Sequence, residues 1–123
     1  MRILGLDPSL SSTGWGIIEV ESNRMRYVAD GYIKTDAKMN IADRLAVIHN
    51  CLKEVLAAYR PDEAAIEQVF LNDNPTSTIK LGMARGVVIL APSLFGITVT
   101  EYEPNKIKKA VVGVGKAAKN QVE

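Results

Sequence analysis

The stretch LGLDPSLSSTGWGII, residues 4–18, decides how this chain begins to fold. Residues 2–7 (RILGLD) are short and apolar, which predicts a buried strand that ends in an acid. The turn-rich PSLSST at residues 8–13 predicts a loop. A second apolar segment at residues 13–20 predicts a second strand. The chain therefore opens as strand, loop and strand, and Asp7 lies where the first strand meets the loop.

The later segments alternate between strands and helices. Residues 24–35 predict a third strand, in which Gly31 indicates a bulge or bend. Residues 41–60 carry an apolar stripe of helical period, with Asn40 as the N-cap and Pro61 as the stop. The remaining expected elements are a strand at 63–70, a helix from Asn74-Pro75 to about 91, a strand at 96–102 and helical segments after 104.

This order, β-β-β-α-β-α-β-α, predicts the α/β class. Three strands in a meander, followed by strands separated by helices, give a mixed five-stranded sheet. Crossovers between parallel strands are right-handed, and we expect helices on both faces of the sheet. The length of 123 residues suits a single domain over residues 1–123.

Composition places the chain among soluble globular proteins, with 47% hydrophobic and 24% charged residues. No apolar run reaches the ~20 residues of a membrane-spanning helix, and no signal peptide is evident. The single cysteine, Cys51, excludes an intrachain disulfide, and we expect a cytoplasmic protein. The net charge of +1 conceals a basic end, because five lysines follow Pro104 against one acid, Glu123. That end predicts either contact with a polyanion or a solvated basic helix.

Two carboxylates, Asp7 and Glu67, lie at or near the ends of apolar strands. Removing a carboxylate from water is costly unless a positive charge compensates. Mg²⁺ takes oxygen ligands and keeps several waters, so one or two carboxylates and a substrate phosphate suffice to hold it. The alternative is structural, because Asp7-Pro8 is also a common turn starter. A shared metal site requires the first and fourth strands to be neighbours, which the sequence alone leaves open.

Three ordered blocks of sequence resemble one known family. They are LGLDPSLSSTGWGII at 4–18, AIEQVFLNDNPTSTIKLGMARGVVI at 65–89 and YEPNKIKKAVVGVGKAAKNQV at 102–122. Together they cover most of the chain and resemble the RuvC family of crossover (Holliday) junction endodeoxyribonucleases. The resemblance implies an RNase H-like fold, a homodimer, and Mg²⁺-dependent symmetric nicking of four-way DNA junctions in recombination and repair, with Mn²⁺ as a substitute ion. It also implies branch-migration partners of the RuvA and RuvB type.

The same resemblance implies roles for five residues. Asp7 and Glu67 match the family's first-strand aspartate and fourth-strand glutamate, which are catalytic metal ligands. Phe70 matches an aromatic residue that meets unpaired bases, and Lys108 and Lys119 match basic residues near the bound DNA strand. Without the family, Phe70 is better explained as a core residue at the end of a strand.

The sequence departs from the family in two places. Ser9 stands where the family usually has glycine, which predicts a slightly rearranged loop. The family also continues into a helix that carries its third and fourth metal-site residues, which are acids or histidine, and Glu123 does not align with them. We therefore expect the final helix to be missing and this chain to be inactive or weakly active. The alternative function is a non-catalytic module that binds branched DNA.

Two further points stay open from the sequence. Gly82 and Gly86 lie four residues apart on the second expected helix, which favours close packing either on the chain's own sheet or on a second subunit. A third functional hypothesis is ATP binding, because this fold has a distant kinship with actin-like ATPases. The missing adenosine-binding domain argues against ATP binding.

Overall fold

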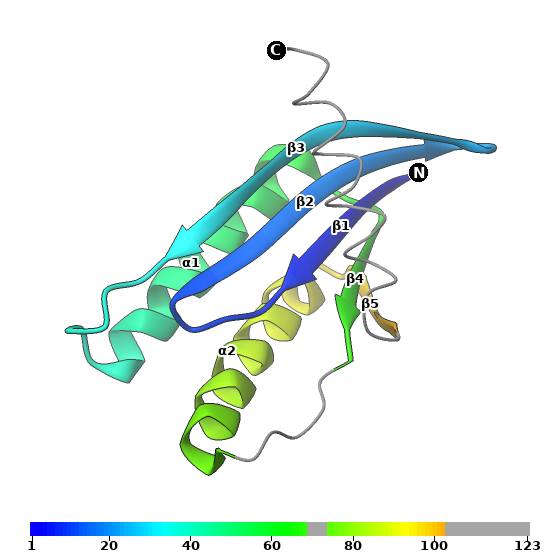
Figure 1. The fold of residues 1–123 in the computed structure, drawn as a ribbon. Helices are drawn as coiled ribbons and strands as arrows, with labels where there is room; N and C mark the ends of the chain where they lie inside the picture. Colours follow the sequence, from blue (N-terminus) through cyan, green and yellow to red (C-terminus); the bar gives the residue numbers. More distant parts are fainter. Residues whose placement is uncertain (69–73, 103–123) are drawn as a thin grey trace, which may run out of the picture.

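A five-stranded mixed sheet forms the centre of the molecule (Figure 1). The computed structural model describes residues 1–68 and 74–102. The elements are β1 (Arg2–Asp7), β2 (Ser12–Glu21), β3 (Arg24–Lys34), α1 (Ile41–Tyr59), β4 (Glu63–Glu67), α2 (Pro75–Leu94) and β5 (Thr98–Tyr102). The strands lie in the order β3-β2-β1-β4-β5. The first three strands form an antiparallel meander, and β4 and β5 run parallel to β1, so the predicted mixed sheet is confirmed.

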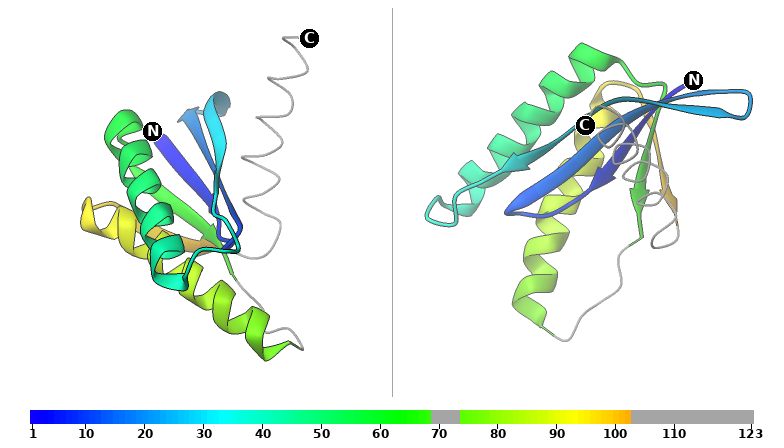
Figure 2. Two further views of the ribbon diagram at one scale, coloured as in Figure 1. Left: turned by 90° about the vertical axis from the view of Figure 1, so that its left-hand side faces the viewer. Right: turned by 45° about the horizontal axis from the view of Figure 1, so that its top comes forward.

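Both described helices lie on the same face of the sheet and contact each other (Figure 2). Each helix connects two parallel strands, α1 between β3 and β4 and α2 between β4 and β5. Both connections move across the sheet in the same direction, towards β5. Because such crossovers are almost always right-handed, two of them in one direction place both helices on one side. The expectation of helices on both faces is thus met for one face. The segment after 104, expected to supply further helix, lies outside the described residues.

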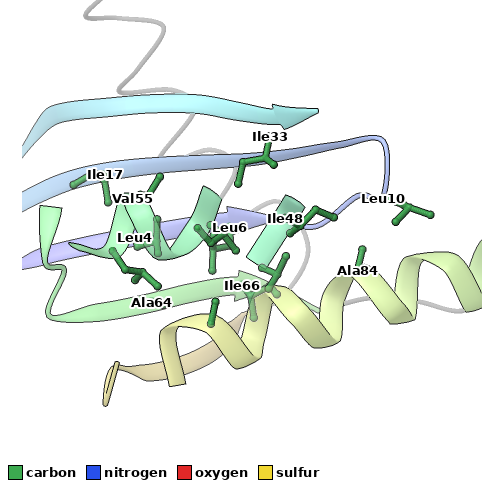
Figure 3. Close-up of a cluster of buried hydrophobic side chains, with 14 residues drawn as sticks. Leu4, Leu6, Leu10, Ile17, Ile33, Ile48, Val55, Ala64, Ile66 and Ala84 are labelled. Atoms are coloured by element: carbon green, nitrogen blue, oxygen red, sulfur yellow. The ribbon is translucent and has the colours of Figure 1, made fainter. Parts of the chain in front are cut away.

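The hydrophobic core lies between the sheet and these helices (Figure 3). Leu4 and Leu6 of β1 and Ala64 and Ile66 of β4 are buried there. The buried helical residues that meet them are Ile48, Leu52, Val55 and Leu56 from α1 and Ala84, Val88 and Ala91 from α2. Since side chains alternate along a strand, the residues between these core positions point to the opposite face of the sheet.

Side-chain caps fix the starts of both helices where the sequence predicts them. The Asn40 side chain accepts a hydrogen bond from the Asp43 backbone N–H at 2.8 Å, and its amide donates to the Asp43 carboxylate at 2.9 Å. The Asn74 side chain accepts from the backbone N–H groups of Thr76 and Ser77. These contacts satisfy donors that have no partner within the helix. None of the helices within 1–68 and 74–102 is long and apolar enough to span a membrane.

The later element ends differ from the sequence prediction. The helix expected to end before Pro92 continues to Leu94, with Pro92 in its last turn. Pro92 is fully buried, and this packing offsets the backbone hydrogen bond that proline cannot donate. A turn with Gly96 at φ +76° follows, so β5 begins at Thr98 rather than at residue 96. β4 ends at Glu67, and residues 69–73 lie outside the described part of the chain.

The bulge expected at Gly31 lies instead at Val28. Ile17 pairs with Ala29 and Ile18 pairs with Tyr27, so Val28 is the extra residue. Gly31 has a different reason to be glycine. A β-carbon there would lie 2.8 Å from Cζ2 of Trp15, the cross-strand partner of Gly31. The missing side chain therefore makes room for the indole ring.

We expect Gly31→Ala to lower the free energy of unfolding by about 1–3 kcal/mol, because the added methyl group overpacks against the indole. Trp15 cannot easily move, since its ring packs on Tyr59 with centroids 5.8 Å apart. Urea denaturation measures the change. In a Trp15→Leu background the same substitution should cost much less. An equal cost in both backgrounds would contradict this explanation.

Candidate metal centre

The two candidate ligands, Asp7 and Glu67, lie on neighbouring parallel strands. β1 and β4 lie side by side (Figure 1), and Leu6 of β1 pairs with Ile66 of β4. Continuing this register by one residue places Asp7 beside Glu67 at the strand ends. Because Leu6 and Ile66 point into the core, both acids point to the face opposite α1 and α2. The adjacency that a shared metal site requires is confirmed, whereas the role of the two acids as ligands stays a prediction.

The chemistry of this pair fits a hard divalent cation. Asp7 is exposed and Glu67 is partly buried, so a hydrated ion can reach at least one of the two carboxylates from solvent. Among residues 1–68 and 74–102, no group of three or more His, Cys, Asp or Glu side chains is placed to hold a metal. Mg²⁺ is often held by one or two carboxylates while it keeps several waters. Two acids at one strand edge therefore fit a metal that completes its coordination with water and substrate.

A row of residues crosses the sheet at the level of these acids and has a tyrosine on each side of them. Gly14 of β2 pairs with Asp7 and with Tyr32 of β3, and Tyr102 of β5 pairs with Glu67. A β-carbon at Gly14 would lie 3.4 Å from Cε1 of Tyr32 and 3.5 Å from Cβ of Asp7. The Tyr32 ring and Asp7 therefore both lie within van der Waals distance of this position.

Both tyrosines of this row are accessible, with Tyr32 68% and Tyr102 37% exposed. Aromatic side chains next to carboxylates can contact the sugars and bases of a nucleic-acid strand. Neither tyrosine stands out from the sequence. No local pattern indicates them, because the register that aligns them with Asp7 and Glu67 joins strands far apart in the chain.

Ser9 fits into the loop after Asp7 without backbone strain. Its φ is not positive, so the loop does not require glycine at this position. The Ser9 hydroxyl accepts a hydrogen bond from the Ser12 backbone N–H at 3.3 Å. The Thr13 hydroxyl donates to the Ser9 carbonyl at 2.6 Å. The serine therefore helps to order the loop that follows the first acid.

The remaining predicted site residues, Phe70, Lys108 and Lys119, lie outside the described residues, so their roles stay predictions. For the two glycines of α2 the structure tests one of the two alternatives, packing on the chain's own sheet, and packing on a second subunit stays a prediction. In the part of the chain that the structure describes, a β-carbon at Gly82 or Gly86 would meet nothing within 4 Å. Close packing of these glycines on the chain's own sheet is therefore wrong.

Comparison with known proteins agrees with the fold described above. The family model for Crossover junction endodeoxyribonuclease RuvC matches residues 3–123. A relative of that name from Rhodospirillum rubrum is 57% identical over 122 residues, which are 99% of this chain and 72% of the relative.

Solved structures show the same similarity. One described as Thermus thermophilus RuvC matches with a TM-score of 0.78 and 32% identity, covering 99% of this chain and 75% of that one. Another, described as T. thermophilus RuvC in complex with Holliday junction substrate, matches with a TM-score of 0.80 and 28% identity, covering 89% of this chain and 68% of that one. These similarities confirm the RNase H-like fold.

Proposed function

Because the chain belongs to the RuvC family of crossover junction endodeoxyribonucleases, we propose that it resolves Holliday junctions by paired symmetric nicks, with Mg²⁺ as the working ion and Mn²⁺ as a substitute. One observation carries the proposal. The parallel pairing of β1 and β4 places Asp7 beside Glu67 at the ends of their strands. Two carboxylates in this arrangement support metal-dependent hydrolysis of a phosphodiester.

The proposed chemistry divides between the ion and the chain. When bound, the metal activates the attacking water and stabilises the leaving oxygen. Asp7 and Glu67 hold and orient the ion. In this proposal Phe70 stacks on an unpaired base, and Lys108 and Lys119 neutralise backbone phosphates. A location in the cytoplasm, where bacterial DNA is found, and partners of the RuvA and RuvB type belong to the same proposal.

The experiment that tests this function compares a synthetic four-way junction with a linear duplex of the same sequence. We expect tighter binding to the junction and, in Mg²⁺ at about the 10 mM level that populates a weak carboxylate site, slow symmetric nicking in keeping with a weakly active chain. The control replaces Mg²⁺ with Ca²⁺, a larger ion with looser coordination, which should permit binding without efficient cutting. Equal binding to junction and duplex would contradict the proposal.

One observation favours a second function, a non-catalytic module that binds branched DNA. Within the described residues, Asp7 and Glu67 are not joined by a third metal-binding side chain. Fewer ligands hold a metal more weakly. Binding of the four-way junction without nicking at any Mg²⁺ or Mn²⁺ concentration would therefore support this second function. The expectation of an inactive or weakly active chain would then be correct.

We also propose that the chain forms a homodimer through α2. Exposed apolar residues and a glycine form one stripe along this helix, here called the α2 stripe: Ile79, Met83, Gly86, Leu90 and Leu94. Their spacing of three or four residues keeps them on one helical face. A bare glycine in such a stripe allows a second backbone to approach closely. A two-fold dimer would also match the symmetry of a four-way junction.

We expect Met83→Glu to weaken dimerisation by about thirtyfold or more, because a central contact of an interface is worth about 2 kcal/mol. Met25→Glu is the matched control, since Met83 is 43% and Met25 46% exposed and Met25 lies on β3, away from α2. Sedimentation velocity over a range of concentrations measures the effect. The proposed dimer through α2 is wrong if both variants sediment alike, or if the unmodified chain stays monomeric at every concentration measured.

A further inference from the structure

Arg85 of α2 joins the ends of the two strands next to the candidate metal centre. Its Nη1 donates a hydrogen bond to the backbone carbonyl of Glu67 at 3.0 Å. Its Nη2 donates to the Glu101 carboxylate of β5 at 2.5 Å, and this contact is also an ion pair. Beside them, the Gln68 backbone N–H donates to the Tyr102 carbonyl at 2.7 Å. The peptide group between Glu67 and Gln68 is therefore hydrogen-bonded through both its carbonyl and its N–H.

The shape of arginine suits this junction between a helix and two strands. A guanidinium group is planar and presents several donors in a fixed fork, so two acceptors on different strands are held at a defined spacing. Hydrogen bonds from a charged donor are about twice as strong as neutral ones. The Arg85 side chain is only 14% exposed, which limits competition from water for the same acceptors.

Arg85 approaches from the helix side of the sheet, whereas the Glu67 carboxylate points to the other side. Glu101, the second partner of Arg85, pairs with Ile66, which points into the core between sheet and helices. The guanidinium group therefore contacts the main chain of Glu67 without occupying the face on which a metal would bind. Through this main-chain contact it can fix the direction in which the Glu67 side chain leaves the strand.

We propose that Arg85 is a positioning residue for Glu67, held in place by Glu101, and that it sets how tightly the acid pair binds a divalent cation. This inference rests on the proposed function for the metal, since it assumes that Glu67 is a ligand. The part that concerns the main chain stands by itself: removing Arg85 loosens the end of β4. Groups that orient a metal ligand without touching the metal typically change its affinity by about 10- to 100-fold.

The test compares Arg85→Met, Arg85→Lys and Glu101→Gln in the full chain. Mn²⁺ affinity is measured by the loss of the free-ion EPR signal on titration. We expect Arg85→Met to weaken binding by about 10- to 100-fold. Arg85→Lys should recover part of this loss, because lysine keeps the charge but lacks the fork. Glu101→Gln should have the smallest effect, since its amide oxygen still accepts a hydrogen bond.

A control separates positioning from general destabilisation. Val87→Ala removes part of a side chain that packs against the core from the same helix, so it destabilises the fold without touching Glu67. It should leave the Mn²⁺ affinity unchanged. The proposal is overturned if Arg85→Met binds Mn²⁺ like the unmodified chain, or if Val87→Ala weakens binding as much as Arg85→Met does.

A second measurement distinguishes failure of this inference from failure of the proposed function. Amide hydrogen exchange in metal-free protein reports on the Gln68 N–H, which is bonded to Tyr102. Arg85→Met should speed its exchange by about tenfold or more, and Val87→Ala should not do so selectively. If the unmodified chain binds no Mn²⁺, the metal function fails for Glu67, and the exchange rates alone decide whether Arg85 holds the strand end. Unchanged exchange would overturn that role as well.

Discussion

Replacing Asp7 with asparagine is expected to reduce metal-dependent junction cleavage by about a thousandfold, a loss of about 4 kcal/mol in transition-state stabilisation. Asparagine has nearly the same shape as aspartate but offers a neutral oxygen, so the strand end should persist while the ion loses an anionic ligand. Junction binding should change much less, because phosphate contacts supply most of the affinity. Nicking rates measured under single-turnover conditions give the first quantity, and fluorescence anisotropy gives the second.

Two further variants make the test of Asp7 specific. Glu67→Gln should cause a comparable loss, because in the proposed centre the two neighbouring carboxylates hold the same ion. Glu21→Gln removes an equal charge from an exposed position at the far end of β2 and should cut like the unmodified chain. If the unmodified chain cuts too slowly for these comparisons, Mn²⁺ affinity replaces the nicking rate as the readout. Normal nicking or metal affinity in both site variants would remove Asp7 and Glu67 from the proposed centre.

The elements themselves follow largely from local sequence. The stripe of α1, the cap at Asn40 and the stop at Pro61 involve residues within one or two turns of each other, so their pattern is readable. The first three strands are short apolar segments separated by clear turns, and none of their observed ends differs from the prediction by more than one residue. The prediction that the second helix ends before Pro92 is wrong, because the burial of Pro92, which offsets the lost hydrogen bond, depends on tertiary packing.

The candidate site depends on contacts that no local pattern encodes. Asp7 and Glu67 can be named from the ends of apolar strands and from the family resemblance, but only the crossover from β3 through α1 brings β4 beside β1. The same non-local register aligns Tyr32 and Tyr102 with the acids. Arg85 lies in the segment 65–89 that resembles the family. Its contact with the Glu67 carbonyl, however, depends on how α2 packs against the sheet.

The second large expected effect is on the free energy of unfolding. Substitutions at two neighbouring residues of β4 should change it by very different amounts, because the two side chains lie on opposite faces of the sheet. Ile66 is fully buried between the sheet and the helices, whereas Glu67 points to the other face. We expect Ile66→Ala to lower the free energy of unfolding by about 2–5 kcal/mol through lost burial and the cavity that remains. Glu67→Gln should change it by about 1 kcal/mol or less, because glutamine keeps the size and an acceptor oxygen of this partly buried glutamate.

Urea denaturation of both variants tests this difference, and Ile66→Val supplies a graded control that should cost about 0.5–1.5 kcal/mol. A typical domain has only about 5–15 kcal/mol of total stability, so Ile66→Ala is best studied at low temperature, where the chain remains folded. Because side chains alternate along a strand, a register slipped by one residue would exchange the two faces. Ile66→Ala would then be mild and Glu67→Gln severe, and that outcome would separate Asp7 from Glu67 and remove the structural basis of the metal centre.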